Sequence, residues 1–273
     1  MQNERRWALI TGASMGLGRA FARECAARGM NLLLVALPGE GLPELGASIA
    51  REAGVSAEWL EADLREPATL ERITSLIRSR DLGLLVNNAG IGGVGLFMDR
   101  PLEHHEATVC LNVLALMRLT RLVAAEFGRG KNCRILNVAS LGAFYPMPTL
   151  SVYSATKSFV LDFSLALRAE LAGSVGVSVL CPNAIRTTSA VGDYVDGFGL
   201  VSRMACMSPE KIARIALDGV ARGKAVIVPG RFNGLLAALS RLVPTALVMK
   251  AIRHYWGGFG AAAESGSEKV GAA

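Results

Sequence analysis

The chain lacks the cysteine pattern of a secreted, disulfide-bonded protein. Five cysteines are scattered over its 273 residues, and no two form a C-x-x-C pair. An odd number of cysteines without regular spacing is typical of reduced thiols in a cytosolic protein. We expect all five to be small apolar side chains within strands and helices. They are Cys25, Cys110, Cys133, Cys181 and Cys206.

Long apolar runs and targeting segments are also missing. No uninterrupted apolar run approaches the roughly 18 residues that a membrane-spanning helix needs. The first six residues, Met-Gln-Asn-Glu-Arg-Arg, contain no apolar segment. We therefore expect no signal peptide and a cytoplasmic location.

Histidine is scarce, with three residues in the chain. None belongs to an H-E-x-x-H motif or to a Cys/His ligand pattern, so we expect no metal site. His104 and His105 open a predicted helix, where exposed or capping roles are expected, and His254 lies on a basic helix face.

Acidic residues are absent between Asp218 and Glu264. The segment 219–263 holds six Lys and Arg residues, which equals the net charge of +6 for the whole chain. The remaining residues therefore sum to zero charge. Because the basic character is local, the chain does not have the general basic surface of a nucleic-acid-binding protein.

What the chain has in abundance is apolar residues, at 51% of the sequence with a mean hydropathy of +0.37. This composition predicts a large core, and the length suits one α/β domain. Strand-like runs alternate with helix-like stretches, which predicts a parallel sheet with helices on both faces. The predicted strands are 7–10, 31–36, 55–62, 82–86, 134–139, 177–181 and 225–228. The predicted helices are 19–28, 43–53, one from Pro67, 102–127, 152–171 and 209–221.

Two regions depart from this alternation. Residues 188–207 mix glycines with large apolar residues, which indicates either a functional lid or an unrecognised helix. After Gly230, Pro244 separates two apolar stripes, of which the first contains Leu235, Leu236, Leu239, Leu242 and Val243. We favour helices that cover the sheet edge or the substrate cleft. The alternative is a basic amphipathic pair, over about 231–256, that touches a membrane surface or a partner.

The first strand leads into the motif T-G-x-x-x-G-x-G at Thr11–Gly18. A strand, a glycine turn and a helix start together form an anion-binding site. Glycines allow the backbone to approach a pyrophosphate, and the free N–H groups of the helix start favour its charge. The spacing differs from G-x-G-x-x-G, and glycine turns also occur for structural reasons alone.

Further motifs follow in a fixed order. They are Asn87-Asn88-Ala89-Gly90 after a predicted strand, Asn112 in a predicted helix, Ser140 at a strand end, and Tyr153-x-x-x-Lys157. Together with the glycine motif, these residues closely resemble the short-chain dehydrogenase/reductase family, from about residue 6 to residue 230. The resemblance implies one doubly wound Rossmann-type α/β domain with a parallel sheet of about seven strands, extended by C-terminal helices.

The resemblance also implies a catalytic set. Tyr153 would be the general acid/base, and Lys157, one helical turn later on the same face, would lower the pKa of the tyrosine and hold the nicotinamide ribose. Ser140 would polarise the substrate carbonyl, and Asn112 would hold a water molecule of a proton relay. Asn87 is expected to tie neighbouring strands together.

By the same resemblance, the cofactor is NAD(P). Pro182-Asn183-Ala184-Ile185-Arg186-Thr187 resembles the family's P-G-x-V-x-T, with Asn183 in place of glycine; asparagine tolerates a positive φ, which would preserve the turn. The implied cofactor-binding residues are Gly12, Ser14, Met15, Gly16, Leu17, Gly18, Ala36, Leu37, Asp63, Leu64, Asn88, Ala89, Gly90, Tyr153, Lys157, Pro182, Asn183, Ile185 and Thr187.

The choice between NAD and NADP depends on the end of the second strand. An acidic residue there binds the ribose 2′-hydroxyl, whereas an arginine accepts a 2′-phosphate. Ala36-Leu37-Pro38 has neither, and Met15 stands where some relatives carry a basic residue. The missing aspartate favours NADP slightly over NAD.

Together these features predict an NAD(P)-dependent oxidoreductase that interconverts an alcohol and a ketone or aldehyde. Residues 1–230 would form the catalytic domain, with a substrate loop at about 188–207. Residues 231–259 would be an amphipathic helical extension, and 260–273 a mobile tail. The apolar lid and stripes favour a lipophilic substrate, and helices 102–127 and 152–171 match elements that pair in homodimers or homotetramers. The alternative function is a cofactor-bound regulatory or scaffold protein with little turnover.

Overall fold

The computed structural model describes residues 5–127, 132–183, 207–240, 243 and 247. Among these residues, seven strands form one parallel sheet in the order β3-β2-β1-β4-β5-β6-β7. The strands are β1 (Trp7–Thr11), β2 (Asn31–Ala36), β3 (Ala57–Glu61), β4 (Leu82–Asn87), β5 (Arg134–Val138), β6 (Gly176–Leu180) and β7 (Val226–Ile227). The doubly wound α/β fold expected from the sequence is therefore confirmed.

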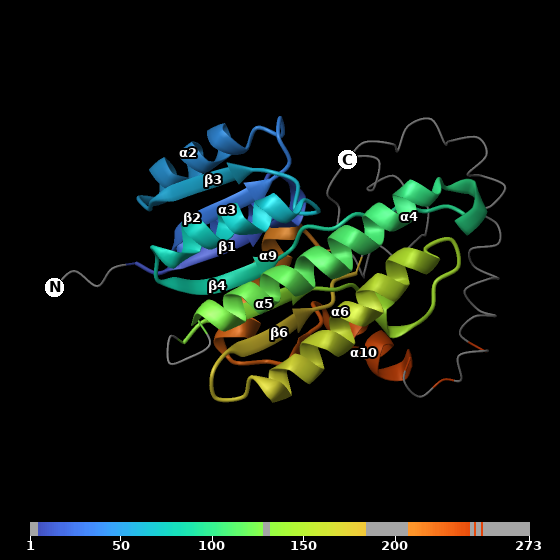
Figure 1. Ribbon diagram of the computed structural model, residues 1–273. Coiled ribbons are helices and arrows are strands. Elements are labelled where there is room, and N and C mark those ends of the chain that lie inside the picture. The colour runs from blue at the N-terminus through green and yellow to red at the C-terminus, as the bar shows by residue number, and fades with distance from the viewer. Residues whose placement is uncertain (1–4, 128–131, 184–206, 241–242, 244–246, 248–273) are drawn as a thin grey trace.

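Helices cover both faces of the sheet. They are α1 (Gly16–Ala27), α2 (Leu42–Ala53), α3 (Pro67–Arg78), α4 (Leu102–Val109), α5 (Leu116–Phe127), α6 (Ser151–Glu170), α9 (Pro209–Ala221) and α10 (Arg231–Ser240). Short helices are η1 (Phe97–Asp99), the π-helix η2 (Cys110–Ala115) and η3 (Leu141–Phe144). In Figure 1, α5 and α6 cross the near face of the sheet, and α9 lies behind it.

Successive residues of a strand point to opposite faces, and in the central strands β1, β2 and β4 both sets are mostly apolar. In β1, Leu9 packs in the cluster that contains α3 and α5, whereas Ala8 and Ile10 pack in the cluster that contains α1, α2 and α9. A strand buried on both faces needs a continuous apolar run, and this is the pattern that the sequence shows. Asn87 is an exception with a structural role: its Nδ2 donates to Asn137 Oδ1 of β5 at 2.8 Å. The expectation that Asn87 ties strands together is confirmed.

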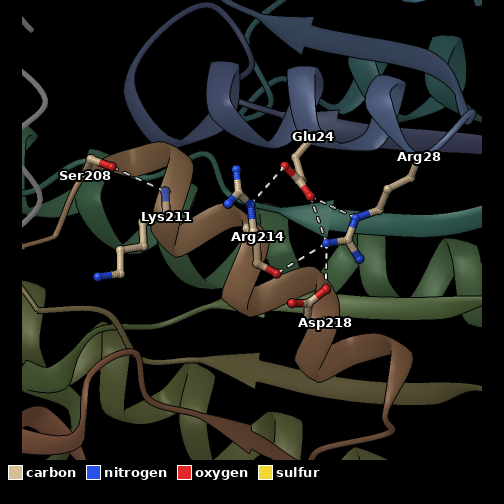
Figure 2. A network of polar contacts seen from close by, with 6 residues as sticks. All are labelled: Glu24, Arg28, Ser208, Lys211, Arg214 and Asp218. Carbon is tan, nitrogen blue, oxygen red and sulfur yellow. Dashed lines mark hydrogen bonds and ion pairs between the residues drawn. The ribbon is translucent and has the colours of Figure 1, made fainter.

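On the far face, α1 packs against α9. Figure 2 shows the polar contacts that border this packing: Arg28 Nη2 lies 2.8 Å from both Glu24 Oε1 and Asp218 Oδ1. Ser208 caps α9 by accepting a hydrogen bond from the backbone N–H of Lys211, and Pro209 occupies the first helical position, as the sequence indicates.

Several predicted boundaries were wrong. Helix α1 begins at Gly16 rather than Arg19, because the glycine turn already has helical hydrogen bonding, with Arg19 N donating to Met15 O. The third strand is shorter than 55–62, and the last strand has two residues. The predicted helix 102–127 is interrupted by the π-helix η2, which has no helix-period signature in the sequence.

The helical stretch Leu102–Phe127 is long and apolar enough to span a membrane, by length and composition alone. A core helix meets the same criterion, and Leu119, Val123 and Phe127 are buried in the core. No disulfide joins the cysteines that the structure describes. Three of them, Cys25, Cys133 and Cys181, are buried, in agreement with their expected apolar role.

Helix α10 contacts η3, which begins next to Ser140. Its fully buried residues are Asn233 and Ala237, while Leu235 and Leu239 are 56% and 44% exposed. The predicted apolar stripe is thus partly exposed, and its role in covering the sheet edge or the substrate cleft stays a prediction. Leu242, most of the second stripe, most of the loop 188–207 and the tail 260–273 lie outside the described residues.

Candidate active site

The strand order reverses between β1 and β4, and ligands of open α/β sheets bind beyond the carboxyl ends of the strands at such a point. Four segments that the sequence singled out leave the sheet at this edge. They are the glycine turn after β1, the Asn88 loop after β4, Ser140 after β5 and Pro182 after β6.

Tyr153 and Lys157 lie on one face of α6, as their spacing predicts. The Lys157 side chain is 5% exposed, and its Nζ donates to the Val138 carbonyl of β5 at 2.9 Å. The same Nζ lies 5.7 Å from the centroid of the Tyr153 ring. The hydrogen bond to the end of β5 therefore fixes the position of the Lys157 amino group, which lies over the face of the Tyr153 ring.

Ser140 lies between β5 and η3, facing Tyr153 of α6. It caps η3 by accepting the Gly142 N–H on its Oγ at 3.1 Å, which fixes the direction of the side chain. A side-chain hydrogen bond also joins Ser140 to Tyr153. The structure thus brings two further catalytic residues expected from the sequence to Tyr153: Ser140 lies at its hydroxyl group and Lys157 lies over its ring.

Burial shifts the pKa values of both Tyr153 and Lys157. Burial raises the pKa of Tyr153 above its ordinary value, and the hydrogen bond to Ser140 offsets only part of this. Burial also lowers the pKa of Lys157 to about 8. The lowering of the Tyr153 pKa by Lys157 stays a prediction. The Lys157 ammonium group lies over the ring and donates to the Val138 carbonyl.

Asn112 is fully buried in the π-helix η2. Its Oδ1 accepts the Ile91 N–H at 2.9 Å, and its Nδ2 donates to the Ile91 carbonyl at 2.8 Å and to Thr156 Oγ1 at 3.1 Å. These bonds attach the loop after β4 to α6. A Cβ added to Gly90 would lie 3.0 Å from Asn112 Oδ1 and 3.3 Å from Lys157 Nζ, so Gly90 keeps this space open. The role of Asn112 in holding a water molecule stays a prediction.

The glycine turn has the form that a pyrophosphate site requires. Gly12 and Gly16 have φ of +62° and +51°, a region that glycine adopts without strain. A Cβ on Gly18 would lie 1.8 Å from the Gly12 carbonyl oxygen, so the helix can approach the turn only with glycine there. No side chain caps the start of α1 at Met15, which leaves its first N–H groups for an anion.

The loop after β4 is fastened to this turn. Asn88 Nδ2 donates to the carbonyls of Thr11 and Gly12, at 2.9 and 3.2 Å. Thr11 Oγ1 accepts the N–H groups of Asn88 and Ala89, both at 3.0 Å. The Asn88 side chain therefore has a structural role, because it holds the loop against the glycine turn. The contact of Asn88 with the cofactor, which the family resemblance implies, stays a prediction.

Two expected adenine contacts follow β3. Leu64 is buried, and the Asp63 carboxylate is bound by its neighbour Arg65, whose Nη2 lies 2.5 Å from Oδ2. These hydrogen bonds lower the pKa of Asp63. The pairing of Arg65 with Asp63 was not predicted, although an arginine two residues after an aspartate could have indicated it.

At the end of β2, Ala36 is buried, and Leu37 is 45% exposed, as is Met15 of the glycine turn. The Ser14 hydroxyl does not point to open solvent: it donates to the carboxylate of Glu40, in the loop after β2. Sequence reasoning missed Glu40, because only the fold of the loop brings it to the glycine turn.

The segment after β6 is described as far as Asn183. The Pro182 carbonyl accepts the Leu141 N–H at 2.7 Å, and Asn183 Nδ2 donates to Asn233 Oδ1 of α10 at 3.0 Å. Asn183 is not among the described residues with positive φ, so the expected left-handed turn at this position was wrong. The side-chain bond to α10 fixes its conformation instead. Ile185 and Thr187 lie outside the described residues.

A small cleft opens beside Tyr153, lined by Gly92, Gly93, Arg100 and His104 among others. A Cβ on Gly92 would lie 2.9 Å from the tyrosine ring. Burial, followed by the charge of Arg100, lowers the pKa of His104. His104, expected in an exposed or capping role, is half-buried in the lining of this cleft. His105 stacks on Phe97 with ring centroids 4.6 Å apart.

Comparisons with known proteins agree with this geometry. A very-long-chain 3-oxoacyl-CoA reductase of Pyrenophora tritici-repentis is 33% identical over 80% of this chain and 66% of its own length. Human 17-beta-hydroxysteroid dehydrogenase type 3 is 35% identical over 67% of this chain and 60% of its own length. The chain thus spans somewhat less than two thirds of these relatives.

One solved structure matches over a larger share of both chains than these two relatives do. A short-chain dehydrogenase from Sphingobium yanoikuyae in complex with NADPH superimposes with a TM-score of 0.73 and 34% identity, covering 87% of this chain and 94% of that one. The family model described as short chain dehydrogenase matches residues 6–194, which include the glycine turn, Asn112, Ser140, Tyr153 and Lys157. The chain belongs to the short chain dehydrogenase family.

Proposed function

We propose that the protein is an NAD(P)-dependent oxidoreductase that interconverts an alcohol and a ketone or aldehyde on a lipophilic substrate. The observation that carries this proposal is the gathering of Ser140 at the hydroxyl group and of Lys157 over the ring of Tyr153, at the carboxyl edge of the sheet. Family membership and the NADPH complex of the Sphingobium yanoikuyae relative support the cofactor class.

The residues present fit a dinucleotide. The open N–H groups at the start of α1 and the glycine turn would hold the pyrophosphate, and Lys157 and the Asn88–Gly90 loop would border the nicotinamide ribose. When bound, the nicotinamide supplies or accepts the hydride at the substrate carbon.

The protein side chains would manage the proton. In the reducing direction, the Tyr153 hydroxyl donates its proton to the carbonyl oxygen while Ser140 donates a hydrogen bond to the same oxygen. The raised pKa of Tyr153 keeps the hydroxyl protonated until the reaction, and the nearby Lys157 ammonium stabilises the phenolate that results. In the oxidising direction, the same oxygen removes the proton from the alcohol.

A lipophilic substrate is supported by two observations. Relatives that share a third of the sequence are named for very-long-chain acyl and steroid substrates. In this chain, the segment after the Asn88–Gly90 loop exposes apolar side chains: Val94, Leu96, Phe97 and Met98. Peripheral membrane contact and a cytoplasmic location stay predictions; the exposure of Leu235 and Leu239 on α10 supports the former.

The test is a turnover assay with NADH and NADPH against a panel of steroid ketones, long-chain 3-oxoacyl thioesters and small carbonyl compounds. We expect oxidation of the reduced nucleotide with at least one lipophilic member. Nucleotide binding without turnover across the panel, in both directions, would instead support the regulatory or scaffold alternative.

A further inference from the structure

The ends of β1, β2 and β3 form one continuous edge beside the glycine turn. The Ala13 N–H donates to the Val35 carbonyl of β2 at 3.2 Å, and the Ala62 N–H after β3 donates to the Ala36 carbonyl at 2.8 Å. The loop 37–41 therefore starts between the glycine turn and the end of β3. In open dinucleotide-binding sheets, this is where the adenosine ribose lies.

Glycines fold this loop back toward the turn. Gly39 and Gly41 have φ of +79° and +68°, so a left-handed residue precedes and follows Glu40. The Glu40 carboxylate accepts the hydroxyl hydrogen of Ser14, in the middle of the glycine turn. Although Glu40 comes four residues after the strand end, its carboxylate lies at the glycine turn that the strand end borders.

The other charged groups of this edge do not offset the carboxylate. The segment Gly12–Gly18 contains no ionisable side chain, and Glu40 is the one charged residue of the loop 37–41. From β3, Glu61 Oε1 accepts the Gly39 N–H at 3.1 Å and adds a second carboxylate. After β3, the first cation in the chain is Arg65, and its guanidinium is bound by Asp63.

We propose that Glu40 is the residue that selects the cofactor, and that this chain prefers NAD(H) to NADP(H). The carboxylate accepts hydrogen bonds from the ribose hydroxyls, and its charge opposes a 2′-phosphate at the same place. This inference rests on the proposed function. It reverses the slight preference for NADP drawn from Ala36-Leu37-Pro38, since the acid that these residues lack is supplied by the loop.

The test is a binding titration that needs no turnover. The intrinsic fluorescence of the wild type, Glu40→Gln and Glu52→Gln is titrated with NADH and with NADPH at low ionic strength. Glu52 is exposed on α2, where it pairs with Arg23, and losing its charge is the matched control. We expect the wild type to bind NADH about tenfold more tightly than NADPH, an affinity difference typical of one charge-assisted contact. Glu40→Gln should bring the two affinities close together, and Glu52→Gln should leave their ratio unchanged.

Ser14→Ala separates position from charge. This variant keeps the charge of Glu40 but removes the hydroxyl group that holds its carboxylate. The preference for NADH over NADPH should therefore fall to a value between those of the wild type and Glu40→Gln, even if both affinities change. Equal or tighter binding of NADPH by the wild type would overturn the inference and leave the proposed function standing, as would a Glu40→Gln ratio equal to that of the wild type. Failure of the wild type to bind either nucleotide would overturn both.

Discussion

Lys157 places an amino group in a part of the protein where its side chain is 5% exposed. Burial lowers its pKa from 10.5 to about 8, so between these values the unfolded chain binds more protons than the folded one. The free energy of unfolding therefore rises with pH across this window. At lower pH, protonation of Lys157 stabilises the unfolded state more than the folded one, and this difference disappears as the proton is lost.

Replacing Lys157 with methionine should remove this dependence. Between pH 7.5 and 9.5, the free energy of unfolding of the wild type should increase relative to Lys157→Met by about 1–3 kcal/mol. Urea denaturation at both pH values measures the difference. The exposed Lys211→Met is the control for losing a lysine, and its difference from the wild type should stay flat. A flat difference for Lys157→Met as well would show that the buried amino group has no lowered pKa. The window ends below pH 10, where the raised pKa of Tyr153 acts in the opposite direction.

Site residues whose positions are set by a helix or by the end of a strand were predictable from the sequence. Tyr153 and Lys157 follow from helical spacing, and Ser140 from the end of a buried strand. Glu40, Arg65 and His104 were not predicted to share in the site, because their places depend on loop conformations. The path from Ala36 to Glu40 includes a left-handed residue, and no local pattern specifies where such a loop directs its side chain.

The turn between β1 and α1 depends on close backbone packing. A Cβ on Gly18 would lie 1.8 Å from the Gly12 carbonyl oxygen and 2.7 Å from its carbon. Both atoms are backbone, so Gly18→Ala must displace the helix from the turn. We expect a loss of about 1–3 kcal/mol in the free energy of unfolding and a marked loss of nucleotide affinity.

Gly234→Ala in α10 is the matched control, since nothing lies within 4 Å of its added Cβ. There, alanine should stabilise the helix by about 0.5–1 kcal/mol through its higher helix propensity. Thermal or urea denaturation and nucleotide titration of both variants check this. Retention of wild-type stability by Gly18→Ala would mean that the turn is looser than the structure shows.

At the scale of elements, apolar periodicity and turn residues predicted nearly every strand and helix in the described residues. Boundaries were less predictable where hydrogen bonding extends past the apolar pattern, as at Gly16. The π-helix was not predictable either. Its extra residue per turn depends on burying Asn112 between the Ile91 backbone and Thr156, a tertiary contact that leaves the local composition unchanged.

At the scale of the whole molecule, helices α4 and α6 leave an open groove with apolar walls. Its lining includes Phe97, Val109, Val113, Val152 and Phe159. Phe159 is 38% exposed and stacks on Phe163, with ring centroids 5.5 Å apart. We predict that a second copy of the chain covers this groove, since exposed apolar surface of this kind favours association.

Phe159→Glu should therefore shift the protein from dimer or tetramer toward monomer, because the charge would be buried without a partner. Phe159→Leu retains an apolar side chain and should assemble as the wild type does. Sedimentation velocity at micromolar concentration distinguishes these cases. A wild-type monomer would contradict the assembly prediction while leaving the catalytic proposal untouched.

The central claim is that the Tyr153 hydroxyl transfers the proton in an alcohol–carbonyl oxidoreduction. Its most direct test compares Tyr153→Phe with Tyr145→Phe on a substrate that the wild type turns over, with nucleotide affinity measured on the same preparations. Each variant loses one hydroxyl group from a half-buried tyrosine. We predict that Tyr153→Phe binds the nucleotide almost as tightly as the wild type but loses about 10²–10⁴-fold in turnover, and that Tyr145→Phe keeps most of its activity. Turnover of Tyr153→Phe at the wild-type rate would contradict the account.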